Sequence, residues 1–143
     1  ARGYAITTST VNDRLNHHFL CGDYRIAISQ TEEGNLRASG FFELSQPDAK
    51  PKNEFYEFLL NRSSLYFELF KNVKVIEKWV GSRPCTPDLF PIIGKSIRYK
   101  NLLIATGHCR LGMTLAPYTA NVIVSTIEGK EEISEVKPSR FGL

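Results

Sequence analysis

Long apolar runs, basic tracts and paired-cysteine motifs are all missing from this sequence of 143 residues. No run approaches the roughly 18 to 20 apolar residues that span a bilayer, and the opening residues 1–4 lack a signal-peptide pattern. The 18 Lys and Arg residues are spread along the chain and the net charge is only +3, so nothing favours a nucleic-acid partner. These absences favour a cytoplasmic protein, with peripheral attachment to the inner membrane left open.

Cysteine is scarce and unpatterned. Cys21, Cys85 and Cys109 are an odd number, are widely separated and form no CxxC pair, so we expect reduced thiols instead of a disulfide framework or a zinc ribbon. His17 and His18 have the residue type of metal ligands. Adjacent residues of a strand point to opposite faces, however, and no fourth ligand has suitable spacing, so we expect an exposed loop and no metal.

The composition is that of a folded domain, with 42% hydrophobic and 23% charged residues. Alternating polar and apolar residues predict strands over 4–10 and 73–80 and a hairpin over 23–44. Apolar residues recur at helical spacing over 55–70, which predicts one amphipathic helix. Residues 1–82 are therefore expected to form a mainly antiparallel sheet with a packed helix.

The remaining residues, 83–143, follow a different pattern. Three prolines within 84–91 predict a rigid loop, and the continuous apolar run 102–106 predicts a strand buried on both faces. A turn over 107–112 then leads into a helix over 113–127. The expected fold class is α+β, in which this strand, turn and helix belong to a second layer.

The segment Gly107–Thr114 contains the first chemical signal. A glycine-bounded turn between a strand and a helix directs unpaired N–H groups and the positive end of the helix dipole at an electron-rich ligand. The spacing nearly matches a phosphate-binding P-loop, but Met113 replaces the required lysine, so an NTPase is rejected. The alternative to a ligand site is an ordinary strand-to-helix turn, in which the glycines only allow a tight bend.

Four blocks in the second half of the chain carry a resemblance. They are WVGSRPCTPD at 79–88, PIIG at 91–94, NLLIATGH at 101–108 and GMTLAP at 112–117. In this order and spacing they resemble the C-terminal blocks of the FAD-dependent D-amino-acid oxidase superfamily. The segments 2–7 and 23–28 are similar to its D-amino-acid dehydrogenase branch (small subunit), so the resemblance covers nearly the whole chain.

The resemblance implies site residues. Arg83, in the Arg-Pro block, would pair with the substrate carboxylate through its planar guanidinium, and a structural arginine beside a loop proline is the alternative. Backbone N–H groups of the glycine-bounded turn would stabilise negative charge on the reduced flavin. The cofactor-binding residues implied are Gly107, His108, Cys109, Arg110, Leu111, Gly112, Met113 and Thr114.

Three of the remaining positions have competing interpretations. Arg110 resembles glycine oxidases, which place an arginine between the two glycines, and a second cation would favour a small or acidic amino acid; a surface ion pair is the alternative. Tyr4 is a candidate to line the substrate, although a strand aromatic is also typical of a core. A structural role is favoured for His108, and no catalytic side chain is assigned.

The implied reaction is oxidation of the Cα–N bond of a D-amino acid or glycine to a 2-oxo acid and ammonia, with hydride transfer to FAD. The GxGxxG turn that grips the ADP half of FAD is absent, and the sequence opens on Ala1, not Met. We therefore expect an incomplete FAD site, with 1–82 as substrate-domain sheet and helix and 83–143 as the return to a flavin domain. A preceding N-terminal segment of the same protein would complete that domain.

A function of another class is also open. The chain could be a non-catalytic binding or interaction module that retains the sheet and self-associates through an exposed sheet edge. An unrelated α+β ligand-binding domain would require four ordered blocks to be coincidence.

Overall fold

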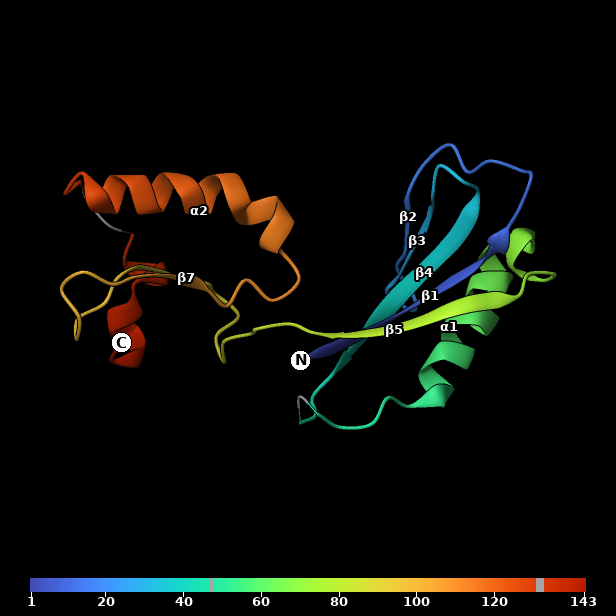
Figure 1. Cartoon of the computed structure of the whole chain (residues 1–143), viewed down its shortest axis with the longest axis horizontal. Coiled ribbons are helices and arrows are strands. Elements are labelled where there is room, and N and C mark those ends of the chain that lie inside the picture. The colour runs from blue at the N-terminus through green and yellow to red at the C-terminus, as the bar shows by residue number, and fades with distance from the viewer. Residues whose placement is uncertain (47, 131–132) are drawn as a thin grey trace. The chain divides into compact units, whose positions relative to one another are not determined.

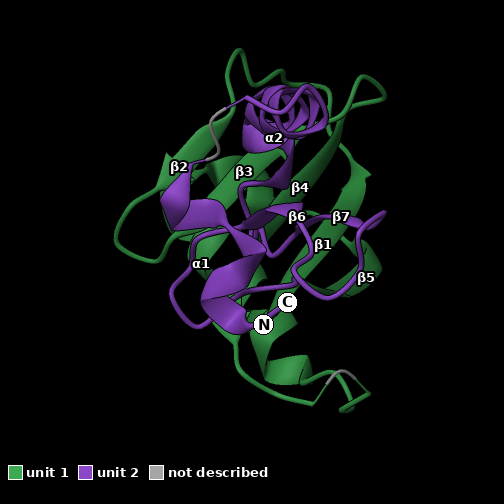
Figure 2. Ribbon diagram, turned by 90° about the vertical axis from the view of Figure 1, so that its left-hand side faces the viewer, with its two compact units in different colours: residues 1–82 green, residues 83–143 purple. Residues whose placement is uncertain are grey.

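The structure is a computed structural model and describes residues 1–46, 48–130 and 133–143. The chain divides into two compact units, unit 1 over Ala1–Ser82 and unit 2 over Arg83–Leu143 (Figure 2). The boundary falls at the position expected from the sequence, while the assignment of the units to a substrate and a flavin domain stays a prediction. Among the described residues, no helix combines the length and apolar character that crossing a membrane requires.

Unit 1 is an antiparallel sheet of five strands in the order β2-β3-β4-β1-β5, with one helix (Figure 1). Its elements are β1 (Arg2–Thr10), β2 (Phe19–Cys21), β3 (Ile26–Gln30), β4 (Asn35–Glu43), α1 (Asn53–Tyr66) and β5 (Val75–Ser82). The α+β fold class predicted from the sequence is confirmed.

The core of unit 1 lies between the sheet and α1. Alternate residues of the strands point to one face, and the apolar residues there are almost completely buried. They include Tyr4, Ile6, Ile26, Ile28, Leu36 and Ala38 of the sheet and Tyr56 and Leu59 of the helix. Burial of this face, about 25 cal/mol per Å² of apolar surface, stabilises the pairing register.

Three elements of unit 1 differ from their predictions. The strand expected from residue 24 begins at Ile26, because Arg25 adopts the left-handed conformation (φ 51°) in a turn. The predicted single helix ends at Tyr66, since Phe67 is extended (φ −135°) and a 3-10 turn over Glu68–Phe70 follows. That break directs Phe70 into the core, with 2% of its surface exposed. The strand β2 was missed, because its three residues are too few to show alternation.

Unit 2 contains a two-stranded antiparallel sheet, formed by β6 (Ile92–Lys95) and β7 (Leu103–Thr106), and the helix α2 (Gly112–Ile127) (Figure 1). Two 3-10 turns, Ser134–Val136 and Pro138–Phe141, follow the helix. The buried residues Ile93, Val122 and Val136 form a small core where α2 and the C-terminal turns meet β6.

Two expectations for unit 2 were wrong. The segment 92–95, expected within the loop or at its end, is the strand β6, which Pro91 precedes without interrupting. The apolar run expected to be buried on both faces is largely exposed: Leu103, Ala105 and Thr106 all contact solvent. In a sheet of two strands β6 covers only one edge of β7, and the other edge and much of its surface stay exposed. Unit 2 therefore buries less of this run than its apolar character predicted.

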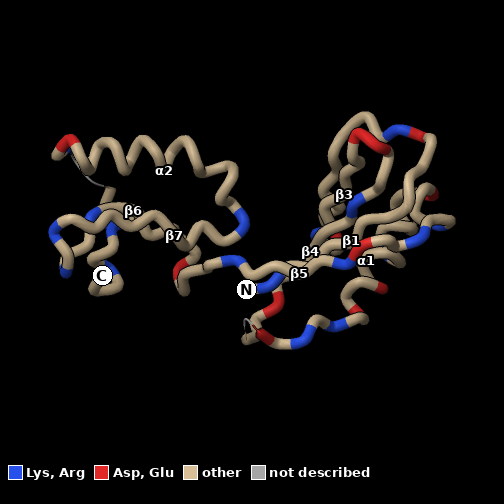
Figure 3. The backbone as a smooth tube through the Cα atoms, viewed as in Figure 1, with Lys and Arg blue, Asp and Glu red and all other residues tan. Residues whose placement is uncertain are grey.

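Charged residues do not gather on either unit. Figure 3 shows Lys and Arg, in blue, distributed along the backbone of both units. This matches the dispersed basic residues of the sequence.

Candidate functional site

The glycine-bounded turn joins β7 to α2 and requires a glycine at its first position. Gly107 is buried with φ +79°, and a Cβ atom there would lie 2.8 Å from Cγ2 of Thr86. A side chain is thus excluded both by the left-handed backbone and by the neighbouring loop. The backbone N–H of Leu111 donates to the carbonyl of His108 at 2.9 Å, which closes the turn directly before the helix.

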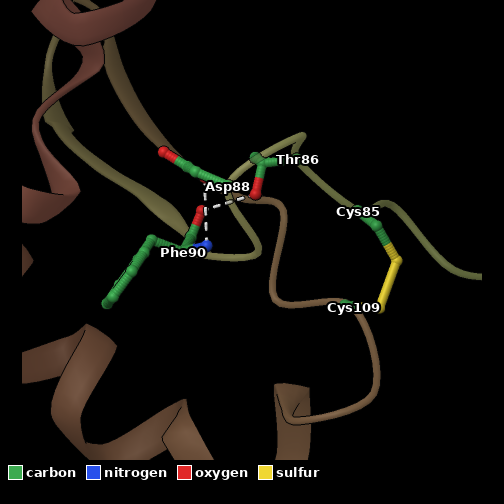
Figure 4. The surroundings of a disulfide bond; sticks show 5 residues. All are labelled: Cys85, Thr86, Asp88, Phe90 and Cys109. Carbon is green, nitrogen blue, oxygen red and sulfur yellow. Dashed lines mark hydrogen bonds between the residues drawn. A yellow bond between two sulfur atoms is a disulfide. The ribbon is translucent and has the colours of Figure 1, made fainter.

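The loop that carries Arg83 lies directly against this turn. The backbone N–H of Cys109 donates to the carbonyl of Pro84 at 2.9 Å, and Cys85 pairs with His108 in an isolated antiparallel bridge. A disulfide joins Cys85 to Cys109 (Figure 4). The structure therefore brings together the Arg-Pro block and the turn, the two parts of the site that the sequence singled out.

The expectation of three reduced thiols was wrong for two of them. Cys85 and Cys109 are 24 residues apart, and the β6-β7 hairpin between them returns the chain to the same place. Sequence spacing does not reveal such a pairing. Cys21 is a free thiol, and burial, followed by the charge of Asp23, raises its pKa.

The positive charge of Arg110 acts on the guanidinium of Arg83. Arg83 is partly buried, and its pKa is lowered first by burial and then by the positive charge of Arg110. Arg110 is exposed, and the described residues supply no carboxylate partner for it. The surface ion pair considered for Arg110 is therefore not seen, and the pair of cations is arranged to attract an anion.

The start of α2 is open to a ligand. No side chain caps this end of the helix and no acidic residue lies in its first turn, so its first N–H groups lack intrahelical partners. The side chain of Met113 is 92% exposed. Leu111, Gly112 and Thr114 are exposed as well. The turn and the helix start thus present backbone donors beside two cations, an arrangement suited to an electron-rich group.

His108 connects the turn to the body of the helix. Its Nε2 atom lies 2.8 Å from Oγ1 of Thr119, two turns into α2. The hydrogen bond orients the ring, and the backbone bridge to Cys85 holds the segment. The structural role favoured from the sequence stays a prediction.

Tyr4 lies in the core of unit 1, with 1% of its surface exposed. Its hydroxyl donates to Oε2 of Glu43 at 2.7 Å, and its ring packs edge-on against Phe55 and Tyr56. Burial, followed by the hydrogen bond to Glu43, raises the pKa of Tyr4. Tyr4 is therefore a core residue of unit 1. A core position was the alternative to a position lining the substrate.

Sequence reasoning missed one polar contact that holds the site's loop. Arg140, in the last 3-10 turn, donates from Nε to Oδ2 of Asp88 at 2.8 Å and from Nη2 to the carbonyls of Phe90 and Pro91 at 2.7 and 3.0 Å. Asp88 also accepts from the N–H of Phe90, and Thr86 donates to the Phe90 carbonyl (Figure 4). The prolines predicted a rigid loop here, but the partner of Asp88, 52 residues later, could not be predicted.

The histidines considered as ligands lie in the exposed loop before β2. No group of three or more potential metal-binding side chains occurs in the described part of the chain.

Curated relatives of this chain oxidise amino acids, as their names say. The chain is 30% identical over 132 residues to a D-amino acid dehydrogenase of Neisseria gonorrhoeae, covering 91% of this chain and 31% of the relative. It is 25% identical over 146 residues to a D-amino-acid oxidase of Bradyrhizobium diazoefficiens, covering 98% and 34%. The chain thus spans about a third of the length of the curated relatives that it matches.

Solved structures show the same fold. L-proline dehydrogenase from P. horikoshii superposes with a TM-score of 0.84 at 23% identity, over 98% of this chain and 39% of that one. Glycine oxidase from Bacillus cereus superposes with a TM-score of 0.81 at 21% identity, over 94% and 37%. The family model described as "FAD dependent oxidoreductase" matches residues 1–126. The chain belongs to this family of FAD-dependent oxidoreductases.

Proposed function

We propose that the chain is the C-terminal part of a flavoenzyme that oxidises the Cα–N bond of an amino acid, either a D-amino acid or glycine, to a 2-oxo acid and ammonia. One observation carries the proposal: the Arg83 loop is fastened to the Gly107–Thr114 turn by a backbone hydrogen bond, a strand bridge and a disulfide. An arginine that could bind a carboxylate is thereby joined, within unit 2, to a turn that could bind an electron-rich ring.

Arg83 would bind the substrate carboxylate. Its guanidinium is partly removed from water, so a bidentate ion pair there is screened less than one on the surface. Arg110 adds a second positive charge at the same place. This favours substrates that are small enough to leave room for both cations, or that carry a second carboxylate.

The residues at the start of α2 fit the flavin of this family. The family's FAD, when bound, supplies the hydride acceptor for the Cα–H bond. Gly107, Gly112 and the residues between them would contribute backbone N–H groups and the positive helix terminus, which stabilise an anionic reduced ring. Because a Cβ at position 107 would contact Thr86, the conformation of this turn depends on glycine there.

The site of this chain is incomplete on its own. No GxGxxG turn occurs in the sequence, and the chain covers about a third of its relatives. We propose that the missing ADP-binding segment of the same protein packs on the apolar surface of unit 2 that is left exposed by β7 and α2. That surface includes Leu103, Met113, Tyr118, Val124 and Ile127.

A second candidate function rests on β5. This strand is an edge of the five-stranded sheet, and its residues Ile76 and Trp79 are 58% and 51% exposed. An unprotected edge with apolar side chains promotes pairing with another copy. Sedimentation of this chain at increasing concentration separates the two candidates: a non-catalytic interaction module dimerises whether or not flavin is present.

Kinetics of the full-length protein, with the upstream segment included, tests the main proposal. We expect a flavin absorbance that D-amino acids or glycine bleach under anaerobic conditions. Arg83→Lys should raise KM by about 10- to 100-fold, because a point charge replaces a bidentate fork, while Arg98→Lys, on the loop after β6, serves as the matched control. A protein that binds FAD but is not reduced by any amino acid would refute the proposal.

A further inference from the structure

The disulfide joins the two segments that carry the cations of the site. Cys85 is two residues from Arg83, and Cys109 is adjacent to Arg110. The cross-link therefore fixes the segment that bears one guanidinium to the turn that bears the other. Two like charges held together repel, and the lowered pKa of Arg83 in part reflects the charge of Arg110.

Two backbone contacts also join the loop to the turn beside the disulfide. One backbone hydrogen bond, from Cys109 to Pro84, and the bridge between Cys85 and His108 connect the loop to the turn at this place. Within the turn, Cys109 adopts a left-handed conformation with φ 52°, which is unfavourable for a residue other than glycine. Charge repulsion and backbone strain therefore both oppose the closed arrangement that the disulfide holds.

The two cysteines of the disulfide are less buried than the free one. Cys85 and Cys109 are partly exposed, in contrast to the buried Cys21. A thiolate leaving next to guanidinium groups is stabilised by their charge, which speeds attack on the disulfide. Disulfides with such surroundings are typical of regulatory sites, whereas purely structural ones are buried and resist reduction.

We propose that Cys85–Cys109 is a reducible clasp that holds Arg83 and Arg110 beside the flavin-facing turn, and that low-molecular-weight thiols or dithiols open it. In the opening step a dithiol supplies two electrons and two protons. The S–S bond of the clasp breaks, two S–H bonds form on Cys85 and Cys109, and the dithiol becomes a disulfide. Opening releases the turn and weakens amino-acid binding; this last consequence rests on the proposed function.

Peptide mapping of the chain tests whether the clasp forms. The protein, purified in air and alkylated under denaturing conditions without reductant, should yield one alkylated cysteine, Cys21, and a cross-linked pair of peptides containing residues 85 and 109. Alkylation of all three cysteines without reductant would overturn the proposal.

Hydrogen exchange tests whether the clasp controls the turn. Adding dithiothreitol should raise amide exchange in peptides covering 107–114 by about tenfold or more, because the cross-link limits local opening, and leave peptides of 1–82 unchanged. The Cys85→Ser/Cys109→Ser variant should match the reduced protein with or without dithiothreitol, while Cys21→Ala keeps the response. Equal exchange in the oxidised and reduced proteins would overturn the proposal even if the double variant fails to fold.

Kinetics of the full-length flavoenzyme separates the clasp from the proposed function. With dithiothreitol we expect KM for the amino acid to rise several-fold while kcat changes less, and the double variant to be insensitive to the reductant. Amino-acid oxidation with the same KM in both redox states contradicts the clasp and leaves the function intact. If neither state oxidises an amino acid, the function fails, and hydrogen exchange alone decides the clasp.

Discussion

Arg140 and Asp88 form a charge-assisted hydrogen bond of 2.8 Å that fastens the C-terminal turn of unit 2 to the loop beginning at Arg83. The bond holds the pKa of Asp88 at about 2, and the hydrogen bond from the Phe90 N–H adds to the effect. A carboxylate with a depressed folded-state pKa contributes stability above its unfolded pKa of about 3.9 and loses it as pH falls.

We therefore predict that Arg140→Gln lowers the thermal midpoint of the chain at pH 7 and that the difference from wild type shrinks as pH falls from about 4 towards 2. Melting curves recorded by circular dichroism across this range are the measurement. Lys137→Gln, on the same turn, is the control for loss of a positive charge. A difference that stays constant down to pH 2 would show that the Asp88 carboxylate is not the source of the effect.

Replacing Gly107 should lower the free energy of unfolding for two separable reasons. Gly107→Ala places a Cβ 2.8 Å from Thr86 at φ +79°, whereas Gly129→Ala, at φ +71°, meets no atom within 4 Å. The control carries only the left-handed penalty, about 1 to 2 kcal/mol; Gly107→Ala adds overpacking of about 1 to 3 kcal/mol. Urea unfolding followed by far-ultraviolet circular dichroism measures both, and equal losses for the two variants would argue against the contact with Thr86.

Tyr4→Phe distinguishes a core role from a substrate role. The change removes the donor to Oε2 of Glu43, whose side chain is only 8% exposed and keeps its ion pair with Lys52 through Oε1 at 3.0 Å. Loss of a hydrogen bond to a charged group costs about 1.5 to 3 kcal/mol. Unfolding is followed through Trp79, the single tryptophan, on β5 beside β1. In the full-length enzyme the KM for the amino acid should not change. A large rise in KM with unchanged stability would indicate that Tyr4 contacts the substrate.

The core of unit 1 offers a matched pair of leucines on α1. Leu59 is fully buried and Leu65 is 66% exposed. Leu59→Ala should lower the free energy of unfolding by about 2 to 5 kcal/mol, because it leaves a cavity between helix and sheet, and Leu65→Ala should change it by less than about 0.5 kcal/mol. Trp79 fluorescence in urea provides the comparison, and similar losses for both would mean that α1 packs differently.

Much of the fold could be predicted because its signals are local. Alternation at Ile26 and Ile28, or the apolar stripe of α1, follows from side chains within a few residues of one another. The two departures from the local pattern differ in kind. Arg25 is left-handed within a local turn, in which its N–H donates to the carbonyl of Gly22. The extended Phe67 packs its ring against the distant Phe19. Those departures gave the errors in element boundaries.

The residues of the candidate site could be proposed from the sequence, but the contacts that connect them could not. Arg83 and the turn from Gly107 could be proposed from ordered sequence blocks, and the structure places them together. The links that hold them, Cys85 with Cys109 and Asp88 with Arg140, join residues 24 and 52 positions apart and have no periodic signal. Contacts of this kind depend on the folded path of the chain, so they are found only in three dimensions.

The position of the Asp88–Arg140 bond also bears on how fragments of such proteins are chosen for expression. The family match stops at residue 126, yet Arg140 and the core residue Val136 both lie after it. A recombinant fragment trimmed to the family boundary would lack the anchor of the arginine-bearing loop and part of the packing beneath α2. If such a trimmed protein lost ligand affinity, the cause would be the missing C-terminal contacts of Val136 and Arg140. The proposed ligand-binding residues, 83 and 107–114, would all still be present.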